Sequence, residues 1–404
     1  MKVLVLGTGL QGRAALYDLM HSPCVTHIIA ADVNTHALEQ WLARLPRDKI
    51  QVVQVDARDE PQVARLMQRV DAVIVLLPTT FHVAMARLAI ANGIHLINSS
   101  YAPPEFQEIG RQAASRGLAI LPEFGLDPGI DLVLAGHTIR QFDTVYQFYS
   151  YGAGFPEPSA ANNPLRYKIS WTFDGVLKAY RRDARIVRDG QIVDIPGREI
   201  FAPTNIHSVE TEWGTLEAYP NGDVVPYLQA LGILTTVRQA GRFALRYSGH
   251  CAFWYVMAQL GFLEETPQIA GLAPRDFVRL LLEPQLQFAD DERDIALVRV
   301  DARGIKDGRP RHLVYQVVDR RDVQTGLMAM NRTVGYTCSI GAQMILRGDI
   351  RKRGLLSPIT DIPAEVFFNE LRQRGITVQQ AEYEITGLSP ANAAKNETEL
   401  QKPG

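Results

Sequence analysis

The sequence has 404 residues, of which 46% are hydrophobic and 21% charged, and this predicts a globular chain of two or three domains. A formal net charge of -2 and an isoelectric point near 6.5 exclude the strongly basic surface that nucleic-acid-binding proteins carry. No run of about 18 apolar residues is present and the three cysteines are far apart, so we expect a cytoplasmic protein without a membrane segment, a disulfide framework or a metal site.

The N-terminus predicts a nucleotide-binding loop. The apolar run KVLVLG reads as a buried strand, and G-T-G-L-Q-G follows it before a helical stretch. In such a loop the first glycine permits the tight turn, the second lets the backbone approach a pyrophosphate, and the third lets the helix pack against the strand. The helix N-terminus adds free N–H groups and a partial positive charge. The predicted cofactor-binding residues here are Gly7, Gly9, Leu10, Gln11 and Gly12.

An acidic residue ends the second predicted strand. Asp32 closes the run THIIAADVN, where the carboxylate of the dinucleotide fingerprint is expected. A carboxylate there accepts both ribose hydroxyls of NAD and repels the additional phosphate of NADP. NAD is therefore the predicted cofactor, with NADP as the alternative. The competing interpretation is an aspartate that caps the turn before Val33 and Asn34.

Strands and helices then alternate to about residue 131. Further strands are predicted at 51–57, 71–78, 95–100 and 118–124, with helical stretches between them. This alternation indicates right-handed β-α-β units and a doubly wound parallel sheet, in which ligands bind at the carboxyl ends of the strands. The additional cofactor-binding residues predicted at these ends are Asp56, Ala57, Leu77, Pro78, Ser99 and Ser100.

The segment EFGLDPGID, residues 123–131, follows the last of these strands. Asp127 and Asp131 bracket a Pro-Gly pair, which is typical of a turn or of a helix start. Asp127 therefore lies at the ligand end of the sheet. From the residues alone it is either a helix cap or a group that meets a ligand.

The pattern changes after residue 131. Short strand-like runs with R-D-G and K-D-G turns predict a second, mostly antiparallel sheet domain over 132–334. A helix rich in small residues and a short α/β segment follow. The last residues, 391–404, are polar and poor in large apolar groups, so we expect them to be disordered.

Several segments resemble the saccharopine reductases, the glutamate-forming saccharopine dehydrogenases, and their relatives. The most specific are G-L-D-P-G-I and N-P-L-R-Y-K-I-S-W, and further similar segments extend beyond residue 375. The resemblance implies an α/β fold with an N-terminal Rossmann domain, an inserted mixed α+β domain with a largely antiparallel sheet, and a C-terminal segment that returns to the first domain. The implied ranges are 1–131, 132–334 and 335–390.

The resemblance also implies a reaction. It is hydride transfer between NAD(P) and the carbon that bears nitrogen in an amino-acid-derived secondary amine. Asp127 would meet the substrate amine as a catalytic residue, and Tyr101 would lie between nicotinamide and substrate. Lys168 would bind a substrate carboxylate or relay a proton, although a solvated lysine on a strand fits as well. Trp171 would line the pocket, with a core position as the alternative.

Two departures from the reductase pattern concern the substrate. In Y-P-N-G-D, Asn221 is an implied substrate residue, but Gly222 stands where the reductases carry an arginine. Arg246 or Arg242 would have to supply the missing cation. The second departure is His250 at the end of R-Y-S-G-H, where the sequence is similar to the lysine 6-dehydrogenases instead. It is either a core residue or a catalytic group with a pKa suited to moving a proton.

These observations leave alternatives open. The rivals to a saccharopine-type enzyme are a lysine 6-dehydrogenase, a carboxynorspermidine-type dehydrogenase and a non-catalytic NAD-binding protein. Because the edges of the antiparallel sheet must be covered, and because family members commonly pair them across a dimer, we expect a homodimer.

Overall fold

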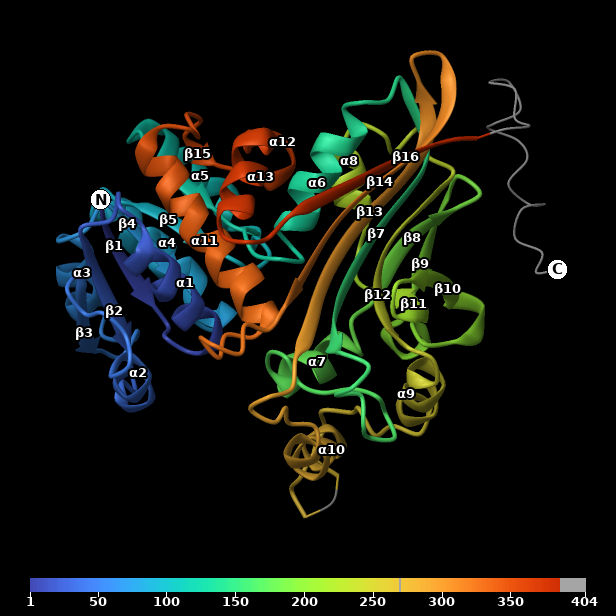
Figure 1. The fold of residues 1–404 in the computed structure, drawn as a ribbon, viewed down its shortest axis with the longest axis horizontal. Coiled ribbons are helices and arrows are strands. Elements are labelled where there is room, and N and C mark those ends of the chain that lie inside the picture. The colour runs from blue at the N-terminus through green and yellow to red at the C-terminus, as the bar shows by residue number, and fades with distance from the viewer. Residues whose placement is uncertain (269, 386–404) are drawn as a thin grey trace. The chain divides into compact units, whose positions relative to one another are not determined.

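The computed structural model of the chain describes residues 1–268 and 270–385 and forms two compact units (Figure 1). The first unit comprises Met1–Val133 and Leu327–Thr377, and the second comprises Leu134–Gly326 and residues 378–385. The chain first passes between the units within helix α6 (Ile130–Ile139). The tail predicted to be disordered, 391–404, lies outside the described residues.

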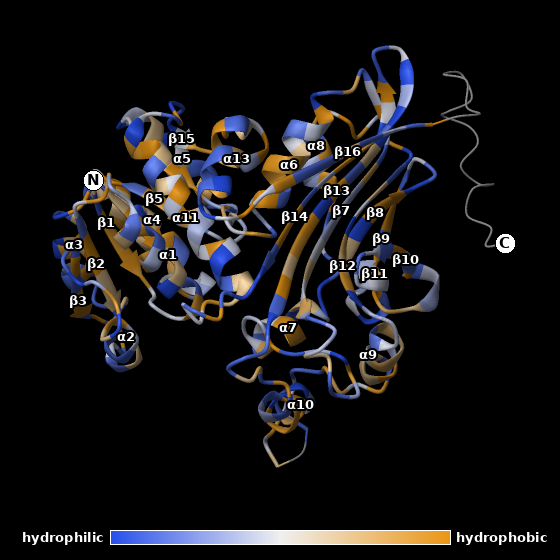
Figure 2. Ribbon diagram, viewed as in Figure 1, coloured by the Kyte–Doolittle hydropathy of each residue, from blue (hydrophilic) through white to orange (hydrophobic). Residues whose placement is uncertain are grey.

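The first unit is built on a seven-stranded sheet in which every neighbouring pair is parallel. This confirms the predicted doubly wound α/β fold. Most residues of these strands are buried because helices cover both faces, and Figure 2 shows the strands as largely hydrophobic. In sheet order the strands are β15 (Gly354–Leu355), β6 (Ala119–Leu121), β5 (His95–Asn98), β4 (Ala72–Val75), β1 (Lys2–Leu6), β2 (His27–Asp32) and β3 (Ile50–Gln54).

Helices of the first unit pack in two layers. Apolar side chains of α3, α4 and α5 form the core on one face of the sheet, and α1 lies with α11 on the other. The helices are α1 (Leu10–His21), α2 (His36–Leu42), α3 (Glu60–Met67), α4 (His82–Ala91), α5 (Phe106–Ser115), α11 (Ala329–Arg347), α12 (Pro358–Asp361) and α13 (Ala364–Gln373), with a short 3₁₀ turn, η1 (Thr79–Phe81).

A buried polar network fastens the C-terminal helices to the first unit. The carboxylate of Asp18 on α1 accepts hydrogen bonds from Ser339 Oγ at 2.6 Å and from Gln343 Nε2 at 3.2 Å. Arg374 Nε approaches the same carboxylate at 2.5 Å. Ser22 Oγ donates to Gln343 Oε1 at 2.6 Å. The network satisfies a carboxylate that is only 7% exposed, so it fixes α11 beside α1.

The second unit carries a nine-stranded mixed sheet, largely antiparallel, in which β12 and β7 are the parallel pair. The strands on its main path are β10 (His207–Thr211), β11 (Gly214–Pro220), β12 (Gln239–Tyr247), β7 (Thr144–Pro156), β13 (Asp294–Lys306), β14 (Arg309–Arg320) and β16 (Val378–Glu384); the hairpin of β8 (Ala184–Arg188) and β9 (Gln191–Ile195) joins β12 at Ala240. Both predicted D-G hairpins are confirmed, with Asp189, Gly190, Asp307 and Gly308 in the left-handed region.

Strand β16 differs from the sequence-based expectation. The segment 335–390 was expected to return as a whole to the first domain, but Val378–Glu384 pairs antiparallel with β14. A strand pairs with whichever neighbouring strand has backbone N–H and C=O groups available for hydrogen bonds. For β16 this neighbour is β14, about sixty residues away in the sequence. The short run VQQAEYE carries no signal for that partner.

Helices cover one face of the second sheet. They are α7 (Phe173–Ala179), α8 (Val225–Ala230), α9 (His250–Gln259) and α10 (Pro274–Leu282), with the 3₁₀ turns η2 (Gly197–Glu199), η3 (Pro203–Asn205) and η4 (Glu283–Gln285). Because side chains alternate along a strand, Ala244 of β12 joins the core under α7 and α9, while Phe243 joins a core on the opposite face. The second sheet therefore has two chemically distinct faces.

Candidate active site

The three glycines of the loop between β1 and α1 have different surroundings. Gly7 has a φ of 92°, and a Cβ there would lie 2.5 Å from the carbonyl oxygen of Leu76. A Cβ on Gly12 would collide with the carbonyl oxygen of Gly7. Around Gly9 nothing lies within 4 Å of such an atom. Open space therefore adjoins Gly9, directly before the first turn of α1, where N–H groups and the helix dipole favour an anion.

Asp32 ties this loop to the end of β2. Its Oδ2 accepts the backbone N–H of Thr8 at 2.6 Å and the Thr8 hydroxyl at 3.1 Å, and its Oδ1 accepts the N–H of Asn34 at 3.1 Å. The half-buried Arg13 lies close enough for the Asp32 charge to raise its pKa, although burial outweighs this and lowers the pKa overall. Asp32 thus brings a negative charge to the glycine loop and also holds the turn.

The other predicted cofactor residues lie at the same edge of the sheet. Asp56 is bound by Arg58, whose Nη2 lies 2.6 Å from Oδ2, and this hydrogen bond lowers the pKa of Asp56. Ala57 and Leu77 are half-buried and Pro78 is exposed. All follow the carboxyl ends of β3 and β4, as the alternation predicts.

The turn at 123–131 is placed beside the end of β5. The N–H of Phe124 donates to the carbonyl oxygen of Asn98, and that of Glu123 donates to Ser100, both at 3.0 Å. A Cβ on Gly125 would lie 2.9 Å from Ser99 Cβ, so this close approach requires glycine. Tyr101, 37% exposed, directly follows. The structure therefore brings Ser99, Ser100 and the Asp127 turn together at the ligand edge.

Asp131 holds the start of α6. Its Oδ1 accepts the N–H of Gly129 at 2.7 Å, and it is 1% exposed. Backbone bonds from Gly125 N to the carbonyl of Pro128 and from Ile130 N to the carbonyl of Gly125 close the turn. Asp127 is half-buried at the tip of the turn. The local structure thus already has one carboxylate dedicated to the helix start.

In the second unit, Arg246 lies in a buried aromatic cluster. Its guanidinium lies 5.3 Å from the ring centroid of Tyr167 and 5.9 Å from that of Tyr219, and Nη1 donates to the carbonyl oxygen of Leu245. Burial raises the pKa of Tyr219 to about 12, so this ring stays neutral. Among the described residues no carboxylate lies within ion-pair distance of Arg246. The cluster therefore contains a positive charge that its surroundings solvate but do not neutralise.

His250 belongs to the same cluster. Its Nε2 lies 2.8 Å from the hydroxyl of Tyr180, its ring lies 5.5 Å from that of Tyr167, and it is 2% exposed. The expected pKa near the ordinary value for histidine does not hold here, because burial and then the Arg246 charge lower the pKa of His250 well below it. The ring is therefore neutral at pH 7.

Lys168 is paired and lies apart from Arg246. Its Nζ contacts Glu292 Oε2 at 2.5 Å, and the two side chains are 7% and 15% exposed. Glu292 is held in turn by Asn162 Nδ2 and by the N–H of Ala289. Trp171 packs on Gly175 at the start of α7 and is half-buried against the core. Lys168 is thus neither a solvated lysine nor an unpaired cation.

The segment with Asn221 and Gly222 has a cation beside it. Asn221 N donates to the carbonyl of Arg242, whose guanidinium stacks 4.6 Å from the ring centroid of Tyr227. Gly222 has a φ of 85°, and a Cβ there would lie 3.8 Å from Cδ and 4.0 Å from Nη1 of Arg182. The side chain of Arg182 therefore passes beside Gly222 at van der Waals distance.

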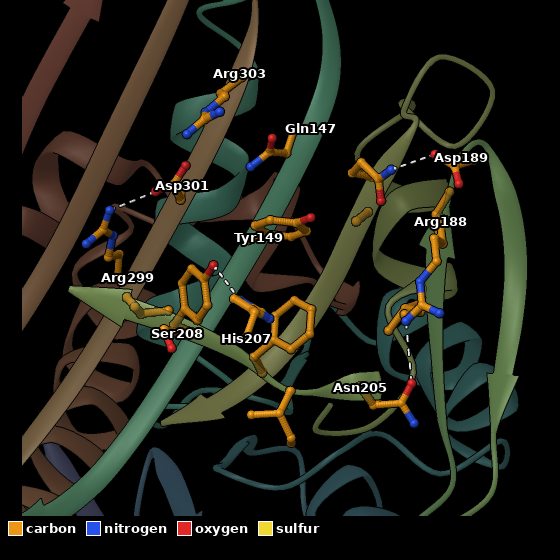
Figure 3. Close-up of a pocket in the computed structure, with 18 of the residues that line it drawn as sticks. Gln147, Tyr149, Arg188, Asp189, Asn205, His207, Ser208, Arg299, Asp301 and Arg303 are labelled. Carbon is orange, nitrogen blue, oxygen red and sulfur yellow. Dashed lines mark hydrogen bonds and ion pairs between the residues drawn. The ribbon is translucent and has the colours of Figure 1, made fainter. Parts of the chain in front are cut away.

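A polar cavity of about 580 Å³ lies on the opposite face of the second sheet (Figure 3). Tyr151 and His207 form a hydrogen bond of 3.1 Å in it, and burial lowers the pKa of His207 to about 4. Asp301 is bound by His312 Nε2 at 2.7 Å and by Arg299 Nη2 at 2.8 Å. None of the predicted site residues lines this cavity, and the sheet separates it from Arg246.

Within residues 1–268 and 270–385, no three side chains of His, Cys, Asp or Glu gather in a way that could hold a metal ion. None of the helices in these ranges has both the length and the apolar character of a membrane span.

Comparison with known families decides the class of the protein. Residues 3–121 match the saccharopine dehydrogenase NADP binding domain, and residues 125–376 match the saccharopine dehydrogenase C-terminal domain. The chain belongs to the saccharopine dehydrogenase family. The resemblance seen in the sequence is thereby confirmed, and with it a pyridine-nucleotide-binding oxidoreductase.

Two relatives and one solved structure are similar over most of their own length. An NADP(+)-dependent, L-glutamate-forming saccharopine dehydrogenase of Pyricularia oryzae is 26% identical over 80% of this chain and 86% of its own. The enzyme of the same name from Schizosaccharomyces pombe is 25% identical over 94% and 98%. The apo structure of the L-Glu-forming enzyme from Saccharomyces cerevisiae has a TM-score of 0.83 at 24% identity, covers 95% of this chain and 99% of its own, and shares the fold.

Sequence reasoning missed several residues of the saccharopine dehydrogenase fold that shape these sites. Tyr180 and Tyr219 surround Arg246, Glu292 neutralises Lys168, and Arg182 lies over Gly222. The even spacing of Arg242, Ala244 and Arg246 on one strand predicts a shared face. No comparable signal exists for Glu292, which is 124 residues from Lys168.

Proposed function

We propose that this chain is an NAD-dependent member of its family that oxidises the C–N bond of saccharopine or of a closely similar secondary amine. Hydride leaves the carbon that bears the nitrogen, the nitrogen loses a proton, and water splits the resulting imine into glutamate and an aldehyde. The nicotinamide cofactor supplies the hydride acceptor. The observation that carries this proposal is the open glycine loop at Gly9, with Ser99 and the Asp127 turn at the same edge of the sheet.

Asp127 is proposed to stabilise the positive charge that develops on the substrate nitrogen. Its position at the ligand edge supports this role, because Gly125 of the same turn packs closely against Ser99. Asp127→Ala should lower turnover about a hundredfold or more and leave NADH affinity nearly unchanged. Asp59→Ala, which removes an ordinary helix cap on α3, is the control and should leave turnover intact. Normal turnover in Asp127→Ala would reduce Asp127 to a structural residue.

Two arginines are proposed to hold substrate carboxylates. Arg246 is a buried cation without a carboxylate partner among the described residues, and Arg182 lies beside Gly222, the position where the reductases carry an arginine. Arg182 is exposed, so Arg182→Ala should fold normally and raise the KM for saccharopine about tenfold or more. Arg188→Ala, which removes an exposed arginine of β8 that bonds Asn205, is the matched control. A KM that changes equally in both variants would exclude a specific role for Arg182.

NAD is proposed as the preferred nucleotide because Asp32 brings a negative charge to the loop beside the expected ribose. Two observations favour NADP instead. The positively charged Arg13 lies near Asp32, and the similar saccharopine dehydrogenases are NADP(+) enzymes. The ratio of kcat/KM with NAD to that with NADP tests the choice, and Asp32→Ser should shift it toward NADP. A preference for NADP in the unmodified chain would overturn the assignment.

The substrate is tested by offering saccharopine, lysine and carboxynorspermidine separately with each nucleotide. Turnover of saccharopine alone supports the proposal. Lysine turnover would favour the lysine 6-dehydrogenase alternative, to which the sequence is similar at His250. Binding of NADH without turnover of any of the three would favour a protein that binds the nucleotide without these reactions.

A homodimer is proposed, with the apolar surface of α9 and α10 as the contact. Val256, Leu260, Phe277, Leu280 and Leu281 are all half or more exposed. The sheet edge at β16 is less suited, because Glu382 and Glu384 lie along it. Light scattering should give twice the chain mass, and Leu280→Asp should give the monomer. A monomeric unmodified chain would refute the proposal.

A cytoplasmic location is proposed from the cysteines. Cys24, Cys251 and Cys338 are unpaired in the structure, as a reducing compartment favours. Fractionation of the source cells with antibodies to the chain would test it, and recovery in an oxidising compartment would contradict it.

A further inference from the structure

Helix α11 runs parallel to α1 in a fixed register. A Cβ on Gly335 would lie 2.6 Å from the backbone N of Ala15 and 2.7 Å from Ala14 Cβ, and Ser339 and Gln343 reach Asp18 and Ser22 further along. Successive turns of α11 therefore contact successive turns of α1 in the same direction along the chain. Extended one turn backward, this register places residue 331 near the N-terminus of α1 and the glycine loop.

Asn331 lies between two parts of the ligand edge. On a helix surface it neighbours Val334 and Gly335, which are three and four residues on. Val334 Cγ1 would lie 3.4 Å from a Cβ on Gly125, and Gly335 packs against Gln11 and Ala15. The face that carries Asn331 therefore passes between the Asp127 turn and the start of α1, in the first unit alone.

The carboxamide of Asn331 has no hydrogen-bond partner for its Nδ2 although the residue is 2% exposed. It lies in the first turn of α11, whose N-cap residue, Met328, makes no side-chain cap bond. The neighbouring Thr333 and Thr337 hydroxyls donate to carbonyl groups of their own helix, so they are satisfied. A buried amide left unsatisfied at a ligand edge is the arrangement expected of a group that completes its hydrogen bonds with a ligand.

We infer that Asn331 binds the carboxamide of the nicotinamide end of the dinucleotide, an inference that rests on dinucleotide binding at the glycine loop. In this type of fold the adenosine ribose binds beside the acidic residue at the end of β2, here Asp32. The nicotinamide half of the cofactor would then extend past Gly9 toward β4, β5 and the Asp127 turn. Asn331 faces that half. A carboxamide offers one acceptor and two donors and so complements a second carboxamide. The positive end of α11 additionally favours the amide oxygen of the ligand.

The test compares reduced nucleotides with a ligand that lacks the nicotinamide end; NADH and ADP-ribose share the rest of their structure. Calorimetric titration of the full chain with NADH, with NADPH in parallel, and with ADP-ribose, which lacks nicotinamide, gives the three affinities. Asn331→Ala and the similarly sized Asn331→Leu should weaken binding of the reduced nucleotides about fivefold to thirtyfold and leave ADP-ribose binding within about twofold. Thr337→Val, on the same helix, is the matched control and should change none of the three. Thermal midpoints verify folding.

Other outcomes overturn the inference. Equal weakening of NADH and ADP-ribose would assign Asn331 to the diphosphate or to the shape of the loop. Unchanged affinity for all three ligands would leave Asn331 without a ligand role. If the unmodified chain binds neither NADH, NADPH nor ADP-ribose, the dinucleotide site itself fails. The last outcome is distinct because it appears before any substitution is made.

Discussion

Replacement of Asp18 by alanine should destabilise the first unit by about 3 kcal/mol. The carboxylate is 7% exposed and binds Ser339, Gln343 and Arg374 across more than three hundred residues of sequence. Loss of one member of a buried ion pair costs about 3–5 kcal/mol. Two contacts reduce the penalty here: Glu370 still pairs with Arg374 at 2.7 Å, and Gln343 still donates to Ser339 at 3.0 Å. The lower end of the range is therefore expected.

Calorimetry of the full chain measures this effect, and the transition that NADH shifts upward identifies the first unit. Its midpoint should fall by about 6–12 °C in Asp18→Ala. Hydrogen exchange should accelerate in α11 and α13, whose contacts the network fixes. Arg58→Ala, which removes an exposed ion pair, is the control and should not move the midpoint. A fall below about 1 kcal/mol in Asp18→Ala would refute the view that this network attaches the C-terminal helices.

Gly9→Ala should leave the thermal midpoint within about 2 °C, because the added Cβ meets nothing within 4 Å, yet weaken NADH binding about tenfold or more; unchanged binding would place the nucleotide elsewhere. Burial lowers the pKa of His207 to about 4, below its value in the unfolded chain. The stability that the neutral, buried His207 contributes to folding is therefore complete above about pH 6.5 and is lost as the pH falls toward 4. His207→Gln should flatten that decline by up to about 3 kcal/mol, and an unaltered pH profile would contradict the burial argument. Glu292→Gln should destabilise the second unit by about 2–3 kcal/mol by stranding Lys168, and adding Lys168→Met should restore at least half; a double variant less stable than the single would refute the pairing.

Much of the first unit follows from local sequence. Its buried strands are short apolar runs that end in glycine or a polar residue, and such periodic signals arise within a few residues of each other. The glycine spacing at 7, 9 and 12 and, in the second unit, the two D-G hairpins depend on backbone geometry that only particular residues permit. These features were predictable because their physical causes are local.

The choice between groups of the same type required the tertiary structure. Lys168 and Arg246 are both cations on apolar segments, but a distant Glu292 neutralises the first while neutral tyrosines enclose the second. The sequence by itself thus determined the parallel sheet and its nucleotide loop, whose causes act over a few residues. Which side chains are paired, buried or left unsatisfied was decided by contacts between segments that are distant in the sequence, whose partners no local pattern specifies.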